Sequence, residues 1–185
     1  AGDAFGQTTS LNSTGNIVAA GARNNDGNGS NAGHVRVFEN VSGVWTQIGS
    51  DIDGEVADDL SGQFLDLNNL GNILAVGARF NDGNGSKSGH VRVFENIEGA
   101  WTQIGSDIDG EATGDELGSS VSLSSDGTIL AVSANLNDGN GLSSGHVRVY
   151  ENIAGAWTKI GSDIDGEALG DGLGSSVSLC SDGGI

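Results

Sequence analysis

The sequence predicts an all-β protein built from blades of a β-propeller, each blade a sheet of four antiparallel strands. One 56-residue unit recurs along the 185 residues of the chain. Within each unit, short runs of alternating polar and apolar or of β-branched residues are separated by glycine-rich turns, which is typical of strands. A four-stranded sheet with apolar faces must stack on its neighbours, as propeller blades do.

The repeat is defined by motifs that recur with an offset of 56 residues. GHVRV begins at residues 33, 89 and 145, and IGSDIDGE begins at residues 48, 104 and 160. The units therefore cover residues 1–56, 57–112 and 113–168, and a fourth begins at 169 and reaches 185. Since propellers need roughly four to eight blades, three and a third blades form an incomplete ring. We expect either a segment of a longer array or self-association that completes the ring.

The third unit shows the expected strand order. Residues 119–123 alternate in polarity and end at a Ser-Asp-Gly turn. Residues 129–134 form a nearly continuous apolar run, which suits a strand covered on both faces. Residues 146–151 alternate again, and residues 157–160 form a short last strand. The acidic stretch that follows leads into the next unit.

Charge excludes one large class of partner. The formal net charge is −18, from 25 acidic and seven basic residues. Nucleic acids and anionic membrane surfaces are bound by basic patches, so neither is an expected partner. No apolar run approaches the roughly 18–20 residues of a membrane span, and we expect no membrane insertion.

Motifs at matching places in the units resemble a known family. Phe5-Gly6 opens the first unit and Gly21-Ala22-Arg23 follows its apolar run. These motifs resemble the FG-GAP repeat of integrin-α-type propellers. The resemblance implies an extracellular or cell-surface protein that binds a protein or glycan ligand. The family's calcium loop has no counterpart here, because a short turn at residues 123–127 takes its place in the third unit. The resemblance therefore transfers no calcium site to that position.

Calcium ligands are instead expected in the NDGNG loops. Oxygen-bearing side chains at alternate positions resemble the start of a calcium loop. The candidate ligands are Asp26, Asn28, Asp82, Asn84, Asp138 and Asn140. The alternative is a structural β-turn, since Asp-Gly and Asn-Gly favour positive φ.

Other repeated residues have two interpretations each. The acids of the DIDGE segments are either cation ligands or solvated linkers between blades. The histidines that start GHVRV strands either bond to neighbouring backbone or form a ring that binds a metal. The arginines two residues later are expected to pair with a carboxylate of the same or the adjacent blade, such as Glu39, Glu95 or Glu151. The tryptophans either pack between blades or stack on sugar rings.

Function is predicted from this symmetry. An active site is normally a single asymmetric place, whereas every acid and histidine of these motifs recurs in the units. We therefore predict a protein that is not an enzyme, and the resemblance to FG-GAP proteins implies an extracellular binding, adhesion or scaffolding module. The alternatives are a carbohydrate-binding propeller and a self-assembling structural repeat protein.

Overall fold

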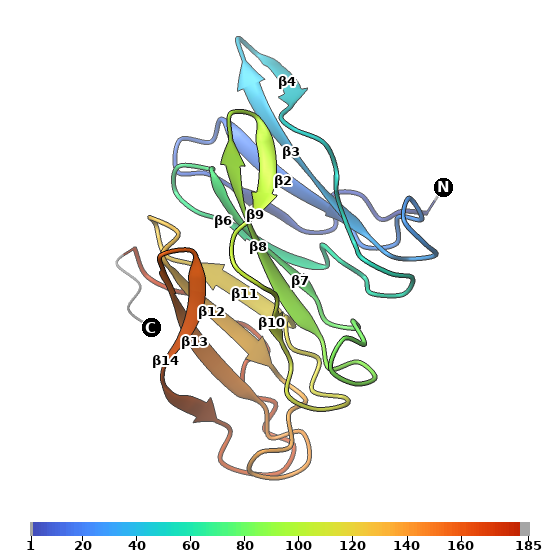
Figure 1. Cartoon of the computed structure of the whole chain (residues 1–185), viewed down its shortest axis with the longest axis vertical. Helices are drawn as coiled ribbons and strands as arrows, with labels where there is room; N and C mark the ends of the chain where they lie inside the picture. The colour runs from blue at the N-terminus through green and yellow to red at the C-terminus, as the bar shows by residue number, and fades with distance from the viewer. Residues whose placement is uncertain (1, 182–185) are drawn as a thin grey trace.

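The computed structural model describes residues 2–181, in which strands and turns form three successive antiparallel sheets and no helix occurs. In Figure 1 the sheets follow one another from blue through green to red, as the chain does. The prediction of four-stranded propeller blades is confirmed. Unit boundaries at 56, 112 and 168 stay predictions, and residues 182–185 of the fourth unit lie outside the described range.

The sheets share one strand order, in which each strand pairs with the next along the chain and the outermost strand or strands pair with the third. The first sheet contains β1 (Thr9–Leu11), β2 (Ile17–Ala22), β3 (His34–Val41), β4 (Val44–Gln47) and β5 (Ile52–Asp53). The second contains β6 (Phe64–Leu67), β7 (Ile73–Ala78), β8 (His90–Ile97), β9 (Ala100–Gln103) and β10 (Ile108–Asp109). The third contains β11 (Ser120–Leu123), β12 (Ile129–Ala134), β13 (His146–Ile153) and β14 (Ala156–Asp165).

The outermost strand of each sheet is longer than the sequence predicted. In the first two sheets it is divided, so that β4 and β5 both pair with β3, and β9 and β10 both pair with β8. In the third sheet it is one strand, β14, whose pairing with β13 shifts register between Val147 and Val149. The acidic DIDGE segments therefore begin inside the sheets, because their Ile-Asp residues are strand residues.

Apolar faces of neighbouring sheets form two cores. Val35, Val37 and Ile52 of the first sheet pack with Leu74 and Val76 of the second. The opposite face of the second sheet packs against the third in the same way. The continuous apolar run of β7 is buried along its whole length, because it faces a sheet on each side. The prediction made for residues 129–134 is confirmed in their strand, β12, which is buried at every position but the first.

The tryptophans join neighbouring blades. Trp101 Nε1 donates to the Ile48 carbonyl at 3.1 Å, and Trp157 Nε1 donates to the Ile104 carbonyl at 3.1 Å. Both rings also pack against the cores between the sheets. Of the two interpretations, packing between blades is therefore the one observed for these two residues.

Truncation of Leu74 should show how much each junction contributes to stability. Leu74 is fully buried between the first two sheets. We expect Leu74→Ala to lower the free energy of unfolding by about 2–5 kcal/mol, because it removes apolar burial and leaves a cavity. Urea denaturation measures this loss. Leu70→Ala is the control: Leu70 is 70% exposed, and its loss should change stability by less than about 0.5 kcal/mol. Equal effects of the two substitutions would contradict this packing.

Candidate metal centre between blades

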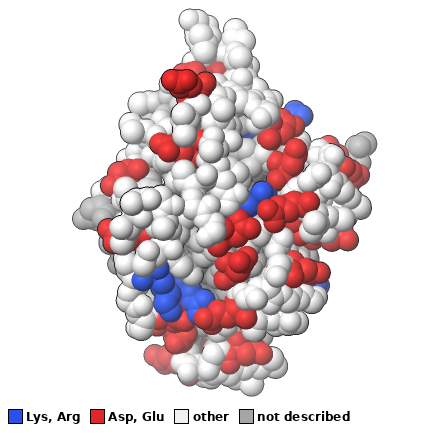
Figure 2. All heavy atoms as spheres, in the orientation of Figure 1, with Lys and Arg blue, Asp and Glu red and all other residues white. Residues whose placement is uncertain are grey.

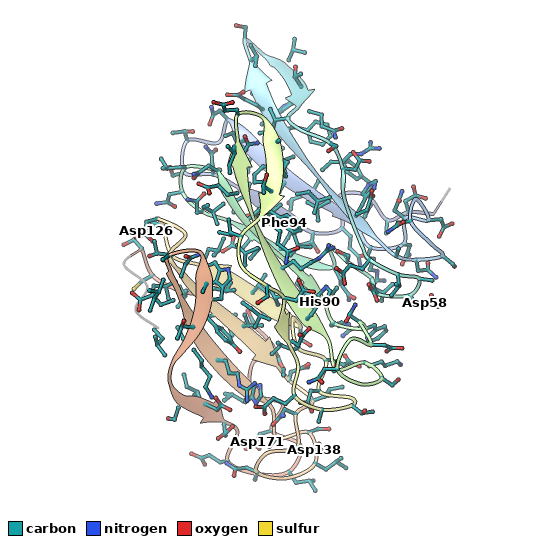
Figure 3. The ribbon with its side chains drawn as sticks, in the orientation of Figure 1. Asp58, His90, Phe94, Asp126, Asp138 and Asp171 are labelled. Atoms are coloured by element: carbon teal, nitrogen blue, oxygen red, sulfur yellow. The ribbon has the colours of Figure 1, made fainter. Side chains whose placement is uncertain are left out.

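The third strand of each sheet places a histidine and an arginine on one face. β8 begins His-Val-Arg-Val, and successive side chains of a strand point to opposite faces. Val91 and Val93 pack toward the third sheet, so His90 and Arg92 face the first. His90 is 1% exposed, and Figure 3 shows it in the middle of the molecule.

The DIDGE segments bring acids to these histidines from two directions. β10 pairs with the start of β8 and sets Asp109 opposite His90. The glutamate that ends each segment reaches the histidine of the following blade, as Glu55 does at His90. Each complete group therefore takes its glutamate from one linker and its histidine and aspartate from the next blade.

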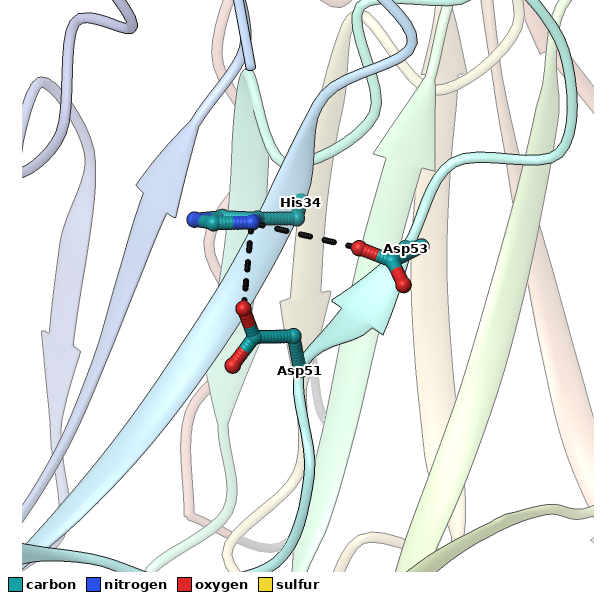
Figure 4. Close-up of side chains that lie close together, drawn as sticks. All are labelled: His34, Asp51 and Asp53. Carbon is teal, nitrogen blue, oxygen red and sulfur yellow. Dashed lines mark ion pairs between the residues drawn. The ribbon is translucent and has the colours of Figure 1, made fainter. Parts of the chain in front are cut away.

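Three groups of one histidine and two acids lie among the described residues, and in each the three ligand atoms lie within 4.8 Å of one another. They are Glu55, His90 and Asp107; Glu111, His146 and Asp163; and His34, Asp51 and Asp53. Figure 4 shows the last of these, in which His34 Nδ1 lies 3.5 Å from Asp51 and 3.9 Å from Asp53. These groups could hold a metal ion.

The distances at His90 are close to those of a metal site. Nδ1 lies 3.9 Å from Glu55 Oε2 and 4.0 Å from Asp107 Oδ2. Ligand atoms around tetrahedral zinc, with bonds of about 2.0–2.2 Å, are separated by roughly 3.4 Å. Each of these two distances would have to shorten by about half an ångström, and the three ligand atoms lie within 4.8 Å of one another. Three protein ligands leave a fourth position open.

A pocket of about 470 Å³ borders this group. Glu55, His90, Asp107 and Asp109 line it together with Asp82 of the NDGNG loop. The molecular surface carries many acids and few bases among them (Figure 2). A cation in the pocket would therefore meet carboxylates from the linker, the strand and the loop.

Burial governs the protonation of the group. Burial, together with the smaller effect of the nearby Arg92 charge, lowers the pKa of His90 to about 4. The ring is therefore neutral at pH 7, which is the form that binds metals. Burial raises the pKa of Glu55, and the negative charges of Asp107, Asp59 and Asp109 add to this, against the opposing effect of Arg92. A bound cation would relieve that crowding of like charges.

The three groups differ in how closely an arginine pairs with their acidic side chains. Arg148 bonds to Glu111 and to Asp163, the latter at 2.7 Å, and this contact holds the pKa of Asp163 at about 2. Arg36 Nε lies 3.1 Å from both oxygens of Asp51.

At His90 the arginine is engaged less closely with the acids. Arg92 lies 3.6 Å from Glu55 and donates instead to the Asp53 carbonyl at 2.7 Å. Asp107 accepts a hydrogen bond from Gln103 at 2.6 Å. The group at His90 is therefore the least neutralised by arginine.

The arginines pair with acids of the same or the adjacent blade, as expected from the sequence, but the three glutamates named as examples were wrong. Glu39 lies three residues after Arg36 in the same strand, so its side chain points to the opposite face, and the same holds for the other two pairs. The observed partners come from the DIDGE segments. The histidines likewise face those carboxylates through Nδ1, while Nε2 of His90 and of His146 is buried without a hydrogen-bond partner.

The six residues predicted as calcium ligands are exposed, and each makes hydrogen bonds through its side chain. The aspartates accept backbone N–H groups, as Asp82 does from Lys87 at 2.7 Å. The asparagines donate to the DIDGE segment, as Asn84 does to the Gly110 carbonyl at 2.8 Å. Of the six, Asp82 lines the pocket at His90. The calcium assignment stays a prediction.

Asp66 was missed from the sequence. It occupies a position where the other units have Ser10, Ser122 and Ser178, so the break in the repeat was the available signal. It accepts hydrogen bonds from the Ser10 hydroxyl at 2.9 Å and from the Leu123 N–H at 2.8 Å. Burial raises its pKa despite these bonds. It lines a second pocket, of about 540 Å³, between the first strands of the sheets.

Comparison with a family model confirms the resemblance seen in the sequence. Residues 107–150 match the FG-GAP repeat. No curated protein matches the chain in sequence.

Two solved structures share the fold. A protein assigned as a 6-phosphogluconolactonase from Bacteroides uniformis has 18% identity and a TM-score of 0.54, over 84% of this chain and 40% of its own. The periplasmic gluconolactonase of Pseudomonas aeruginosa has 15% identity and a TM-score of 0.51, over 83% of this chain and 44% of its own. At these identities the likeness concerns the fold, and this chain spans less than half of either structure.

The prediction of a module without enzymatic activity was wrong. The two structures described above share the fold and are named as lactonases, which are enzymes, so blades of this kind are not restricted to adhesion, scaffolding or sugar binding. The prediction rested on the near-identity of the units. Asp66 and the different arginine contacts at the three histidines show that the units are chemically unequal. The repeat is therefore no ground for excluding catalysis.

Among residues 2–181, no helix is long and apolar enough to cross a membrane.

Stability should fall in mild acid because of His90. Its pKa is lower in the folded chain, about 4, than the unfolded value of about 6.5. The unfolded chain therefore binds more protons between these values, and His90 alone should lower the free energy of unfolding by about 2 kcal/mol from pH 7 to pH 5.

Urea denaturation at the two pH values, in the presence of a chelator, measures this drop. In His90→Asn the drop in the free energy of unfolding should be smaller by about 2 kcal/mol. Part of the drop should persist, because His34 and His146, whose pKa values are also lowered by burial, are still present. An identical drop in both proteins would contradict the role of His90.

Proposed function

We propose that this chain binds a divalent cation between adjacent blades, at Glu55, His90 and Asp107. The observation that supports this proposal is the buried, neutral histidine whose Nδ1 faces two carboxylates at the edge of a pocket. One nitrogen and two carboxylate oxygens suit zinc, manganese or a related first-row ion better than calcium, which takes oxygen ligands. The ion would tie the linker after the first blade to the second blade.

We propose a separate calcium site in the NDGNG loops. In the second blade this site would lie in the same pocket, where Asp82 offers a carboxylate near Asp109. Since Asp82 already holds the Lys87 N–H through Oδ1, its other oxygen would be the ligand. The two cation classes thus use different carboxylates, and substitutions can separate them.

Thermal unfolding with and without metal tests both assignments. We expect zinc or manganese, at about 100 times its dissociation constant, to stabilise the folded chain by about 2.7 kcal/mol relative to chelator. This corresponds to a rise in Tm of roughly 5–10 °C. Asp107→Asn should remove that rise, because it removes a ligand charge while keeping the size of the side chain.

Asp138→Asn is the matched control, since Asp138 lies outside the three histidine groups, and it should leave the rise intact. A calcium-specific rise that Asp82→Asn removes and Asp107→Asn leaves would move the cation to the loop. No rise with any divalent cation would end both assignments.

A second function follows from the open coordination position and the pocket beside it. We propose that this chain hydrolyses a sugar lactone, the class of substrate named for two of the proteins that share the fold, with Glu55, His90 and Asp107 as the residues that would hold the ion. A metal ion can polarise a carbonyl and lower the pKa of bound water. Asp109 lies outside the three ligands, lines the same pocket and has a pKa that burial raises, so it is placed to exchange protons there.

Hydrolysis of gluconolactone, followed as acid release, tests this function. The metal-loaded chain should exceed the spontaneous rate at least about tenfold, and Asp107→Asn should return the rate to the spontaneous one. If the metal binds by the melting test while the rate stays spontaneous, the chain is a cation-binding module without this activity.

We also propose that the protein is exported. The proposal is supported by the periplasmic location named for the Pseudomonas enzyme. The glycan ligand expected from the sequence would be a lactone or another sugar derivative.

A further inference from the structure

We propose that one repeat position, Gln103 in the second blade and Lys159 in the third, decides which cation its inter-blade group takes. Gln103 leaves the group at His90 open to a divalent metal ion, whereas Lys159 supplies the group at His146 with an ammonium of the chain itself. This inference rests on the metal site proposed above and adds its specificity: of two groups with the same ligand types, one takes a metal ion and the other is closed to it.

The two groups are built alike, so their contacts can be compared atom by atom. Each has a glutamate from the preceding linker together with a histidine and an aspartate of its own blade. In each, the side chain four positions before the aspartate donates to the aspartate Oδ1. Gln103 Nε2 lies 2.6 Å from Asp107, and Lys159 Nζ lies 2.6 Å from Asp163. The donor therefore occupies the same place in both blades, and its charge is what differs.

The second oxygen of each aspartate shows what is left for a metal ion. Asp107 Oδ2 faces His90 Nδ1 at 4.0 Å. Asp163 Oδ2 instead accepts a hydrogen bond from Arg148 Nη2 at 2.7 Å. Both oxygens of Asp163 thus bond to cationic side chains, whereas Asp107 bonds to a neutral amide through one oxygen and faces the histidine with the other.

The group at His146 is neutralised by side chains of the chain. Arg148 bonds to Glu111 as well as to Asp163, and Lys159 bonds to Asp163. Two acids therefore meet two cations. A divalent ion that entered this group would have to displace these contacts and would meet two positive charges.

The group at His90 keeps an excess of negative charge. Its two acids share one cation, Arg92, which lies 3.6 Å from Glu55. Gln103 adds a hydrogen bond to Asp107 without adding charge. The three ligands also line the pocket of about 470 Å³ described above, which gives an ion a way in. A divalent ion is therefore attracted here, by the same two acid types that repel no cation of their own.

The two junctions between blades then differ in what holds them. The second and third blades are tied by ion pairs of the chain, with or without metal. The first and second blades gain the corresponding tie when a metal ion binds. Metal availability would therefore act on one junction and leave the other unchanged.

Zinc titration followed by nitrogen NMR of the imidazole rings tests each group separately. The ring signals are assigned by comparison with His34→Asn, His90→Asn and His146→Asn. In the wild-type chain, zinc should shift the Nδ1 signal of His90 and leave that of His146 in place.

Substitution of Gln103 tests the role of charge. Gln103→Lys should weaken zinc binding at His90 at least about tenfold, because even with the dielectric of water a positive charge on the ligand carboxylate repels a divalent ion by that much. Gln103→Met is the matched control, since it also removes the amide but adds no charge. It should change the affinity by less than about threefold, the effect of one hydrogen bond.

Lys159→Gln is the reciprocal change. It removes one of the two cations that bond to Asp163. Zinc should then shift the Nδ1 signal of His146 as well, with an affinity at least about tenfold above that of the wild-type group. Circular dichroism in the presence of a chelator checks that each variant is folded.

The outcomes separate this inference from the metal site on which it rests. A wild-type His90 signal that zinc leaves in place would end the metal site, and this inference with it. Zinc binding at His90 that Gln103→Lys leaves at the wild-type affinity would overturn the inference alone. A His146 signal that zinc leaves in place in Lys159→Gln would do the same, because it would assign the closure of that group to Arg148.

Discussion

Covering both faces of a thin sheet is the constraint on which this structure depends. A single blade cannot bury its own apolar residues, so the stability of each sheet comes from its neighbours. Leu74 and Val76 on one face of the second sheet, and Val91 and Val93 on the other, are buried only because two further sheets stand beside them. The repeat supplies those neighbours in the same orientation, and therefore brings the same polar groups together at each junction.

That orientation explains why the candidate metal groups lie between blades. The valines of β8 occupy one core, and the alternation of the strand turns His90 and Arg92 toward the preceding blade. The linker from that blade ends in Glu55, which meets them. Packing of apolar residues thus decides where the charged ones meet, and the chemistry of the junction follows from the position of the valines.

The sequence predicted the fold better than the site, and the reason is physical. Strand order and blade stacking follow from local polarity patterns, and three copies in phase strengthen each pattern. The groups at His90 combine residues from two successive units, 35 and 17 positions apart in the chain, so no local pattern reveals them. The pairing of Arg36 with Glu39 failed because proximity in sequence was taken for proximity on one face of a strand. Asp66 could have been found, since an acid among serines at one repeat position marks a unit as different.

The few positions at which the units differ affect how the blades reach their correct order during folding. Nearly identical blades offer many wrong pairings of almost equal energy, in which one unit takes the place of another. Asp66 holds Ser10 on one side and the Leu123 N–H on the other. Arg79 lies 3.3 Å from Glu116, an acid that other units replace with Ala4, Leu60 or Gly172. These contacts form when the second blade lies directly before the third, so they act as labels that distinguish the correct arrangement from its permutations.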